Sequence, residues 1–196
     1  MQTNEKKVLL RIQDVKQYFP IKKTHFREKQ KYVKANDGIT LDIYEGETFG
    51  LVGESGCGKS TFGRTILQLY PQTHGKILYQ KDGEWVDLKA QDRESMRSLR
   101  KELQIVFQDP YSSLNPRMTV GQIIGEGLLS HGMFKRGDGA MKDYIFRIME
   151  DCGLATYMFG RYPHQFSGGQ RQRIGIARSL ALRPRFVVCD EAVSAL

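Results

Sequence analysis

Long apolar runs are absent from this chain of 196 residues. The N-terminal stretch MQTNEKKVLL lacks an apolar core of the length that a signal peptide needs, and no window approaches the run of about 18 apolar residues that a membrane span requires. We therefore expect a chain that is neither secreted nor membrane-spanning. Its 40% hydrophobic and 27% charged residues are ordinary for a globular protein and exclude a disordered or fibrous one.

Cysteine is scarce as well, with three residues at Cys57, Cys152 and Cys189. They are too few and too widely spaced for a disulfide framework or a zinc site. The pattern favours a reducing compartment and thiols that are buried or half-buried.

Acidic residues are outnumbered, because 30 Lys and Arg residues stand against 22 Asp and Glu residues and give a formal net charge of +8. Clustered positive charge is typical of nucleic-acid-binding proteins, but here the charge is spread along the chain. Its densest patch, which we call the basic segment, contains Lys22, Lys23, His25, Arg27, Lys29, Lys31 and Lys34. We interpret it as a solvated loop between two strands, with contact to a membrane surface or a partner as the alternative, and expect no nucleic-acid partner.

Two early segments are predicted to form strands. Residues 8–12 are mostly apolar, and residues 39–43 alternate between apolar and polar side chains, so together they indicate a small antiparallel sheet. The apolar stretch from Thr48 to Val52 is expected to form a strand that leads into a glycine-rich loop. A helix should follow from about Lys59 and stop before Pro71.

The middle of the chain changes to a helical pattern. Apolar residues recur at three-and-four spacing from Thr119 to Met149, so we expect an inserted helical lobe at about residues 110–165. The stripe of methionine and aromatic residues on it is more typical of core packing than of a binding groove. Strands are predicted over 76–79 and 103–107, before the lobe.

The residues from Gly53 to Thr61 read GESGCGKST and fit the phosphate-loop pattern G-x-x-x-x-G-K-[ST]. Glycines at this spacing turn successive backbone N–H groups inward around phosphate oxygens, and Lys59 adds a point charge. ATP is therefore the first ligand that the sequence predicts. We call this segment the phosphate loop.

Ser167, Gly168 and Gly169 precede a second predicted helix, which ends before Pro184. The N-terminus of a helix presents unpaired N–H donors, with Ser167 available as a cap or as a direct phosphate donor. A serine-glycine cap by itself is usually structural. Its combination with a phosphate loop favours a nucleotide-binding role.

A short apolar run over 186–189 predicts a buried parallel strand that ends at Asp190 and Glu191. Taken alone, such a pair is more often a solvated turn. Beside a phosphate loop it predicts a cation site, with Asp190 in the shell of Mg²⁺ and Glu191 polarising an attacking water. Gln108 follows another predicted strand and is expected to face the nucleotide, because ligands of open α/β sheets bind at that edge.

The order GESGCGKST, FSGGQRQR and FVVCDE resembles the Walker A, signature and Walker B elements of the ATP-binding-cassette ATPases, with Gln108 at the place of the Q-loop. Residues 108–128 (QDPYSSLNPRMTVGQIIGEGL) and 162–184 (YPHQFSGGQRQRIGIARSLALRP) are similar to the ATP-binding subunits of oligopeptide and dipeptide importers, a group that includes nickel importers. The resemblance covers nearly the whole chain. It implies an α/β fold of the P-loop NTPase type, with a mostly parallel core sheet, an N-terminal antiparallel β subdomain and the inserted helical lobe.

The resemblance also implies roles for individual residues. Lys59, Gln108 and Glu191 would be catalytic, with Lys59 on the β- and γ-phosphates. Ser60 and Gln108 would join Asp190 in the magnesium shell. The residues that would cradle the phosphates of ATP are Gly53, Glu54, Ser55, Gly56, Cys57, Gly58, Lys59, Ser60 and Thr61.

Two further roles concern adenine and a partner subunit. Phe19, or failing that Tyr18, falls where the family places an aromatic side chain that stacks on adenine, with a core residue at a strand end as the plain alternative. Ser167, Gly168 and Gly169 would bind the ATP held by the phosphate loop of a second subunit.

The implied assembly lies at the cytoplasmic side of the cell membrane, where this chain would be a peripheral subunit. It would contain a second ATPase subunit, identical or different, two transmembrane permease subunits and an external solute-binding protein. Its function would be to couple ATP hydrolysis to the uptake of oligopeptides or dipeptides.

The end of the chain departs from the family pattern. Residues 193–196 stop before the expected D-loop aspartate, and the family's γ-phosphate-sensing histidine has no counterpart. The four histidines that are present all precede Asp190: His25, His74, His131 and His164. We therefore expect one ATP-binding domain over residues 1–196, truncated after the Walker B element, that binds MgATP weakly and hydrolyses it poorly.

Three alternatives stay open. The same type of ATPase subunit would equally suit an importer of nickel or of another solute. A soluble cassette ATPase acting on DNA or ribosomes is disfavoured, since neither a long coiled coil nor a second cassette is present. The third alternative is an inactive ATP-binding fragment that docks on membrane subunits.

Overall fold

The computed structural model describes residues 6–23, 25, 29–109 and 111–191. The chain forms two compact units, Met1–Met96 and Arg97–Leu196, and passes from one to the other within helix α2 (Arg93–Leu99).

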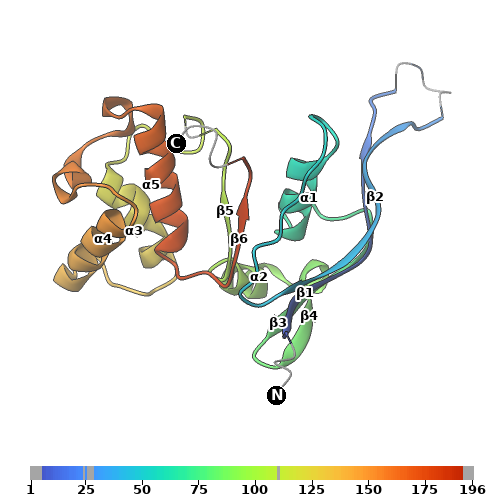
Figure 1. Cartoon of the computed structure of the whole chain (residues 1–196), viewed down its shortest axis with the longest axis horizontal. Coiled ribbons are helices and arrows are strands. Elements are labelled where there is room, and N and C mark those ends of the chain that lie inside the picture. The colour runs from blue at the N-terminus through green and yellow to red at the C-terminus, as the bar shows by residue number, and fades with distance from the viewer. Residues whose placement is uncertain (1–5, 24, 26–28, 110, 192–196) are drawn as a thin grey trace. The chain divides into compact units, whose positions relative to one another are not determined.

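The first unit contains a four-stranded antiparallel sheet in the order β2-β1-β3-β4 (Figure 1). Its strands are β1 (Val8–Pro20), β2 (Tyr32–Tyr44), β3 (His74–Lys81) and β4 (Glu84–Asp87). Ile12 pairs with Leu41 on one side and with Ile77 on the other, and both isoleucines are fully buried. Because side chains alternate along a strand, this register directs the apolar residues into one core.

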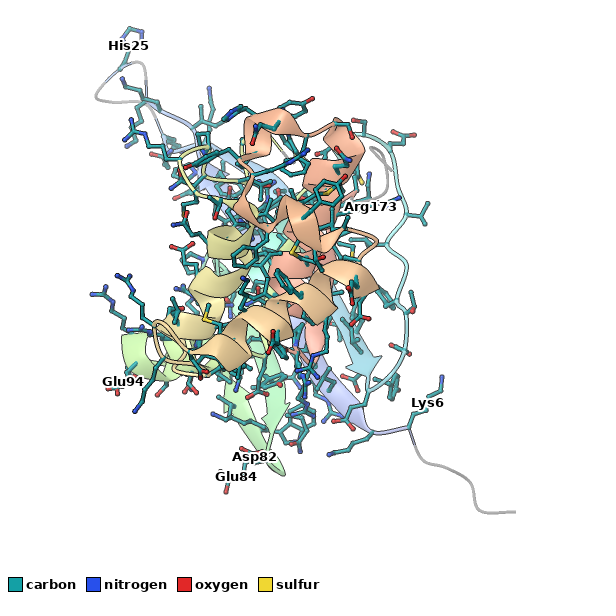
Figure 2. The ribbon with its side chains drawn as sticks, turned by 90° about the vertical axis from the view of Figure 1, so that its left-hand side faces the viewer. Lys6, His25, Asp82, Glu84, Glu94 and Arg173 are labelled. Atoms are coloured by element: carbon teal, nitrogen blue, oxygen red, sulfur yellow. The ribbon has the colours of Figure 1, made fainter. Side chains whose placement is uncertain are left out.

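The hairpin of β1 and β2 is longer than the sequence pattern predicts. β1 continues to Pro20 and β2 begins at Tyr32, so Lys34 of the basic segment lies within a strand rather than in a loop. The side chain of Gln30 donates hydrogen bonds to the carbonyls of Ile21 (2.7 Å) and Lys31 (2.9 Å), which extends the pairing beyond the strand ends. Arg27 lies outside the described residues, and Figure 2 shows His25 at the outer end of this hairpin.

The tight turn between β3 and β4 follows from its two residues. Asp82 and Gly83 have φ angles of 48° and 96°, which is the left-handed conformation that a two-residue hairpin loop needs to match the twist of its strands. Figure 2 shows Asp82 and Glu84 at the outer end of this hairpin. A short 3₁₀ turn (Leu88–Ala90) follows β4.

Helix α1 (Lys59–Ile66) follows the phosphate loop, as predicted, and buries Phe62 and Ile66. It ends before the predicted stop at Pro71, because Gln68 adopts a φ angle of 55° that an α-helix cannot accommodate.

The prediction of a strand from Thr48 to Val52 is wrong. This segment pairs with no strand of its own unit, and the side chain of Val52 is 93% exposed. An apolar run becomes a strand only when a neighbouring strand satisfies its N–H and C=O groups.

The second unit contains two parallel strands, β5 (Leu103–Val106) and β6 (Phe186–Cys189), as predicted, with Val106 opposite Cys189. In Figure 1 its three helices lie together beside this strand pair. They are α3 (Val120–Ser130), α4 (Gly139–Asp151) and α5 (Gly168–Leu180), with short 3₁₀ turns over Thr156–Gly160 and Pro163–Gln165.

Packing of these helices explains the apolar stripe in the sequence. Leu128, Ile145, Met149 and Ile174 are buried in one hydrophobic cluster that joins α3, α4 and α5. The prediction of core packing is therefore confirmed for Ile145 and Met149. None of the helices in the described ranges is long and apolar enough to cross a bilayer.

The prediction for the three thiols is partly wrong. Cys152 is half-buried, and burial raises the pKa of its thiol. Cys57 and Cys189 are exposed, because Cys57 sits in a surface loop and Cys189 at the end of a strand.

Candidate nucleotide-binding site

The phosphate loop owes its shape to left-handed glycines. Gly56 and Gly58 have φ angles of 79° and 96°, which disfavour residues with a Cβ atom. At Gly58 the space is also closed, because a Cβ atom would lie 2.2 Å from the carbonyl oxygen of Ala35. Glycine is therefore required at this position by conformation and by contact.

Asn36 of β2 fastens the loop to the sheet. Its buried side-chain amide donates a hydrogen bond of 3.2 Å to the carbonyl of Gly58, and the N–H of Phe62 donates to the same oxygen at 2.8 Å. Sequence reasoning missed this residue, since Asn36 lies outside the predicted strand 39–43 and no motif marks it.

Lys59 folds back over the loop. Its ammonium group donates hydrogen bonds of 2.8 Å to the carbonyls of Gly53 and Glu54 and lies 3.8 Å from the sulfur of Cys57. A cation is thereby held against the loop, next to the free N–H groups of the first turn of α1. Positive charge and oriented N–H donors at one place form a binding site for anions such as phosphate.

The predicted adenine residue lies at the end of β1. The ring of Phe19 is half-buried and meets the ring of Tyr70 edge to face, with centroids 5.5 Å apart. The alternative, Tyr18, is engaged by other residues, because its hydroxyl group hydrogen-bonds to Asp37 and the ammonium of Lys34 lies over its ring at 5.2 Å. The hydrogen bond to Asp37 raises the pKa of Tyr18.

In the second unit, the carboxyl ends of β5 and β6 bring Gln108 and Glu191 together. The side-chain N–H of Gln108 donates a hydrogen bond of 2.6 Å to the carboxylate of Glu191. Asp190 lies beside them with 6% of its surface exposed, and its backbone N–H donates to the carbonyl of Val106 at 3.0 Å. The sheet thus presents two carboxylates and an amide at one edge.

Asp109 and Tyr111, which follow Gln108 in the chain, are joined by a hydrogen bond. The carboxylate of Asp109 accepts the N–H of Tyr111 at 2.8 Å. Hydrogen bonds from Ser112 and from this N–H lower the pKa of Asp109.

Ser167 acts as the N-terminal cap of α5. Its hydroxyl accepts the N–H of Gln170 at 3.3 Å, while the side chain of Gln170 accepts the N–H of Ser167 at 3.1 Å. This reciprocal capping box leaves Gly168 and Gly169 as the first residues of the helix. Their N–H groups lie at the N-terminus of the helix, which is the positive end of its dipole.

The predicted site residues therefore fall into two sets. The phosphate loop with Phe19 belongs to the first unit, and Gln108, the capping box and the carboxylates belong to the second. Each set is thus brought together within one unit.

Curated proteins of similar sequence are transport subunits. The oligopeptide transport ATP-binding protein OppF of Salmonella typhimurium is 49% identical over 195 residues, which cover 98% of this chain and 57% of that protein. The dipeptide transport ATP-binding protein DppF of Escherichia coli is 45% identical over 188 residues, which cover 96% of this chain and 54% of that protein. The chain thus spans a little over half the length of these relatives.

Solved structures share the fold. The ATP-binding cassette MJ0796, in a dimeric post-hydrolysis state bound to ADP and Pi, matches with a TM-score of 0.82 at 24% identity, over 96% of this chain and 76% of that one. The α/β architecture with its antiparallel β subdomain is therefore that of an ATP-binding cassette. A family model described as ABC transporter matches residues 36–194, and the chain belongs to the ABC transporter family.

Proposed function

We propose that this chain is the ATP-binding and ATP-hydrolysing subunit of an importer for oligopeptides or dipeptides. The observation that carries the proposal is the phosphate loop, in which Lys59 and the first turn of α1 point positive charge and N–H donors at one place. The names of its oligopeptide and dipeptide transport relatives support the class of solute.

Binding of ATP rests on the residues of the first unit. The ammonium of Lys59 exchanges its carbonyl partners for the β- and γ-phosphates, and the loop N–H groups from Gly53 to Thr61 surround the phosphate oxygens. Phe19 stacks on adenine. Phosphoryl transfer needs positioning and charge stabilisation more than covalent chemistry, so this cradle supplies much of what the reaction requires.

Hydrolysis uses the carboxylate edge of the second unit. Glu191 accepts a proton from the water that attacks the γ-phosphorus, the bond to the bridging oxygen of ADP breaks, and ADP and phosphate leave. Gln108 orients Glu191 through its hydrogen bond. Ser60 of the first unit, and Gln108 and Asp190 of the second, each carry an oxygen donor of the kind that Mg²⁺ prefers, and a bound ion would neutralise charge on phosphate oxygens.

The proposed assembly joins two ATPase subunits, identical or different, with two permease subunits and an external solute-binding protein at the cytoplasmic side of the cell membrane. Ser167, Gly168 and Gly169 at the start of α5 bind the ATP of the second subunit. Helix N-termini of this kind suit phosphate groups.

A groove of about 670 Å³ on the second unit supports a permease contact. It lies along α3 and α4, and its lining includes Gly121, Gly125 and Ile145. Charged residues such as Glu126 and Lys142 also line it, and an amphipathic helix of a partner suits a groove of mixed apolar and charged lining. Lys142→Glu should weaken co-purification with the permease and leave ATP affinity unchanged; unaltered co-purification would remove this support.

Calorimetry with MgATP tests the ATP-binding part of the proposal. The full-length protein should bind, and Lys59→Ala should bind far more weakly, while Lys76→Ala at an exposed position of β3 should bind like the wild type. Equal binding by wild type and Lys59→Ala rejects the proposal.

The two remaining alternatives need separate measurements. Uptake of labelled dipeptides and of nickel in a deletion strain distinguishes a peptide importer from a nickel importer. ATP turnover by the 196-residue chain, beside a version as long as its relatives, distinguishes an ATPase from an inactive ATP-binding fragment.

A further inference from the structure

Helix α5 holds the strand that leads to Gln108. The hydroxyl of Ser179 donates a hydrogen bond of 2.9 Å to the carbonyl of Ile105, and the side chain of Gln172 donates one of 3.3 Å to the carbonyl of Phe107. Both polar side chains are buried, so each hydrogen bond is difficult to replace with water. The chain is therefore anchored to α5 immediately before Gln108.

The same helix holds the loop that follows Gln108. The guanidinium of Arg178 donates a hydrogen bond of 2.7 Å to the carbonyl of Ser113, and the guanidinium of Arg171 lies over the ring of Tyr111 at 4.1 Å. Burial lowers the pKa of Arg178, with the charge of Glu126 acting in the opposite direction. Two cations from one helix thus fix the loop on the far side of Gln108.

Core packing anchors this segment only at its far end, where Leu114 is buried in the hydrophobic cluster. Nearer to Gln108, Tyr111 is 63% exposed and Asp109 is exposed, so little apolar surface is buried there. The position of Tyr111 and Ser113 is therefore supported by polar and cation–π contacts with α5, which are specific in direction.

Arg171 has a second contact that reaches the start of α5. Its Nε–H donates a hydrogen bond of 2.8 Å to the carbonyl of Pro163, four residues before the cap Ser167. One side chain therefore touches both the loop after Gln108 and the segment that leads into the proposed binding site for the second ATP.

We propose that Arg171 and Arg178 are positioning residues that set the place of Gln108 relative to Glu191 and link it to the Ser167 cap. A displacement of the cap, as when the second subunit's ATP binds there, then moves Tyr111 and with it Gln108. The inference rests on the proposed function, because it assigns the regulation of the same site.

The test compares Arg171→Gln, Arg178→Gln and Tyr111→Ala in the full-length protein. We expect kcat for ATP hydrolysis to fall about tenfold in each, with KM for ATP within about twofold of wild type, as when a positioning group near a catalytic residue is lost. Tyr111→Phe, which keeps the ring, should restore kcat. The double variant of Arg171 and Tyr111 should be no slower than Arg171→Gln alone, since Tyr111→Ala removes only the cation–π contact that Arg171→Gln has already removed.

Arg173 offers a matched control on the same helix. Its guanidinium donates a hydrogen bond of 3.2 Å to the carbonyl of Gly153, away from the described residues of the Gln108 loop, and Figure 2 labels it on α5. Arg173→Gln should retain wild-type kcat. Wild-type kcat in Arg178→Gln and Arg171→Gln, or equal losses in all three arginine variants, would overturn the proposal.

Amide hydrogen exchange provides a readout that does not depend on catalysis. Protection of residues 105–113 should fall in Arg178→Gln and stay unchanged in Arg173→Gln, at equal thermal midpoints. Unchanged protection in both variants rejects the positioning role, whether or not the wild type hydrolyses ATP. Absence of ATPase activity in the wild type would by itself reject only the proposed function.

Discussion

The amide of Gln108 and the carboxylate of Glu191 lie 83 positions apart in the chain and are joined by a hydrogen bond of 2.6 Å. Their contact follows from the parallel pairing of β5 with β6, which brings both strand ends to one edge. The orientation of Glu191 is therefore set by Gln108 within the second unit.

Glu191→Gln should abolish turnover and spare binding. The amide oxygen of the new side chain still accepts from Gln108, so the edge keeps its geometry, but an amide cannot take a proton from water. Loss of a general base typically lowers the rate about 10²- to 10⁴-fold. Phosphate release at saturating MgATP measures this, and a variant that keeps more than a tenth of the wild-type kcat would exclude Glu191 as the base.

Lys59→Ala should raise the Kd for MgATP about 10- to 100-fold, because hydrogen bonds to charged groups contribute roughly 1.5–3 kcal/mol. The thermal midpoint without nucleotide should change little, since the contacts of the Lys59 ammonium, with two carbonyls and the sulfur of Cys57, lie within one exposed loop. Fluorescent nucleotide titration reports the affinity. A large loss of stability with unchanged affinity would mean that Lys59 serves the fold.

Gly58→Ala and Gly56→Ala form a matched pair. Both glycines have left-handed φ angles, where an L-residue costs about 1–2 kcal/mol. Only Gly58 is closed in, because nothing lies within 4 Å of a Cβ atom placed on Gly56. Urea unfolding should show that Gly58→Ala is the more destabilising substitution by at least about 1 kcal/mol, and equal effects would contradict the closed packing at Ala35.

His131 should make the second unit sensitive to mild acid. Burial, followed by the charges of Arg97 and Lys101, lowers the pKa of His131 below its ordinary value of 6.5. The unfolded chain then takes up a proton at a higher pH than the folded chain does, so the free energy of unfolding should fall as the pH drops below about 6.5. The loss should level off once the pH lies below the folded pKa.

Unfolding midpoints between pH 7.5 and 5 measure this effect. His131→Gln should flatten the curve, whereas His25→Gln at an exposed position should leave it unchanged. A curve of the same slope in His131→Gln would assign the acid sensitivity to another group.

Local patterns predicted much of the fold because their causes are local. Helix α1 begins at Lys59 after a glycine loop, and α5 begins after Ser167, where a serine hydroxyl and a glutamine three residues later satisfy free N–H groups. The strand over 186–189 has the predicted bounds, since four consecutive apolar residues before a carboxylate suit a parallel strand. The predicted burial is wrong: Phe186, Val187 and Val188 are half-buried and Cys189 is exposed, because β5 is its one strand neighbour among the described residues.

The sequence by itself determined the phosphate loop, the cap of α5 and the ends of β5 and β6, because backbone conformation and apolar patterning within a few residues suffice for each. Only the tertiary structure decided that Asn36 holds Gly58, that Arg171 lies over Tyr111 and that Thr48 to Val52 form no strand in their own unit. These features depend on partners 22 or more positions away, or on the absence of a neighbouring strand within the unit. Such contacts are set by strand register and helix packing, which no short stretch of sequence encodes.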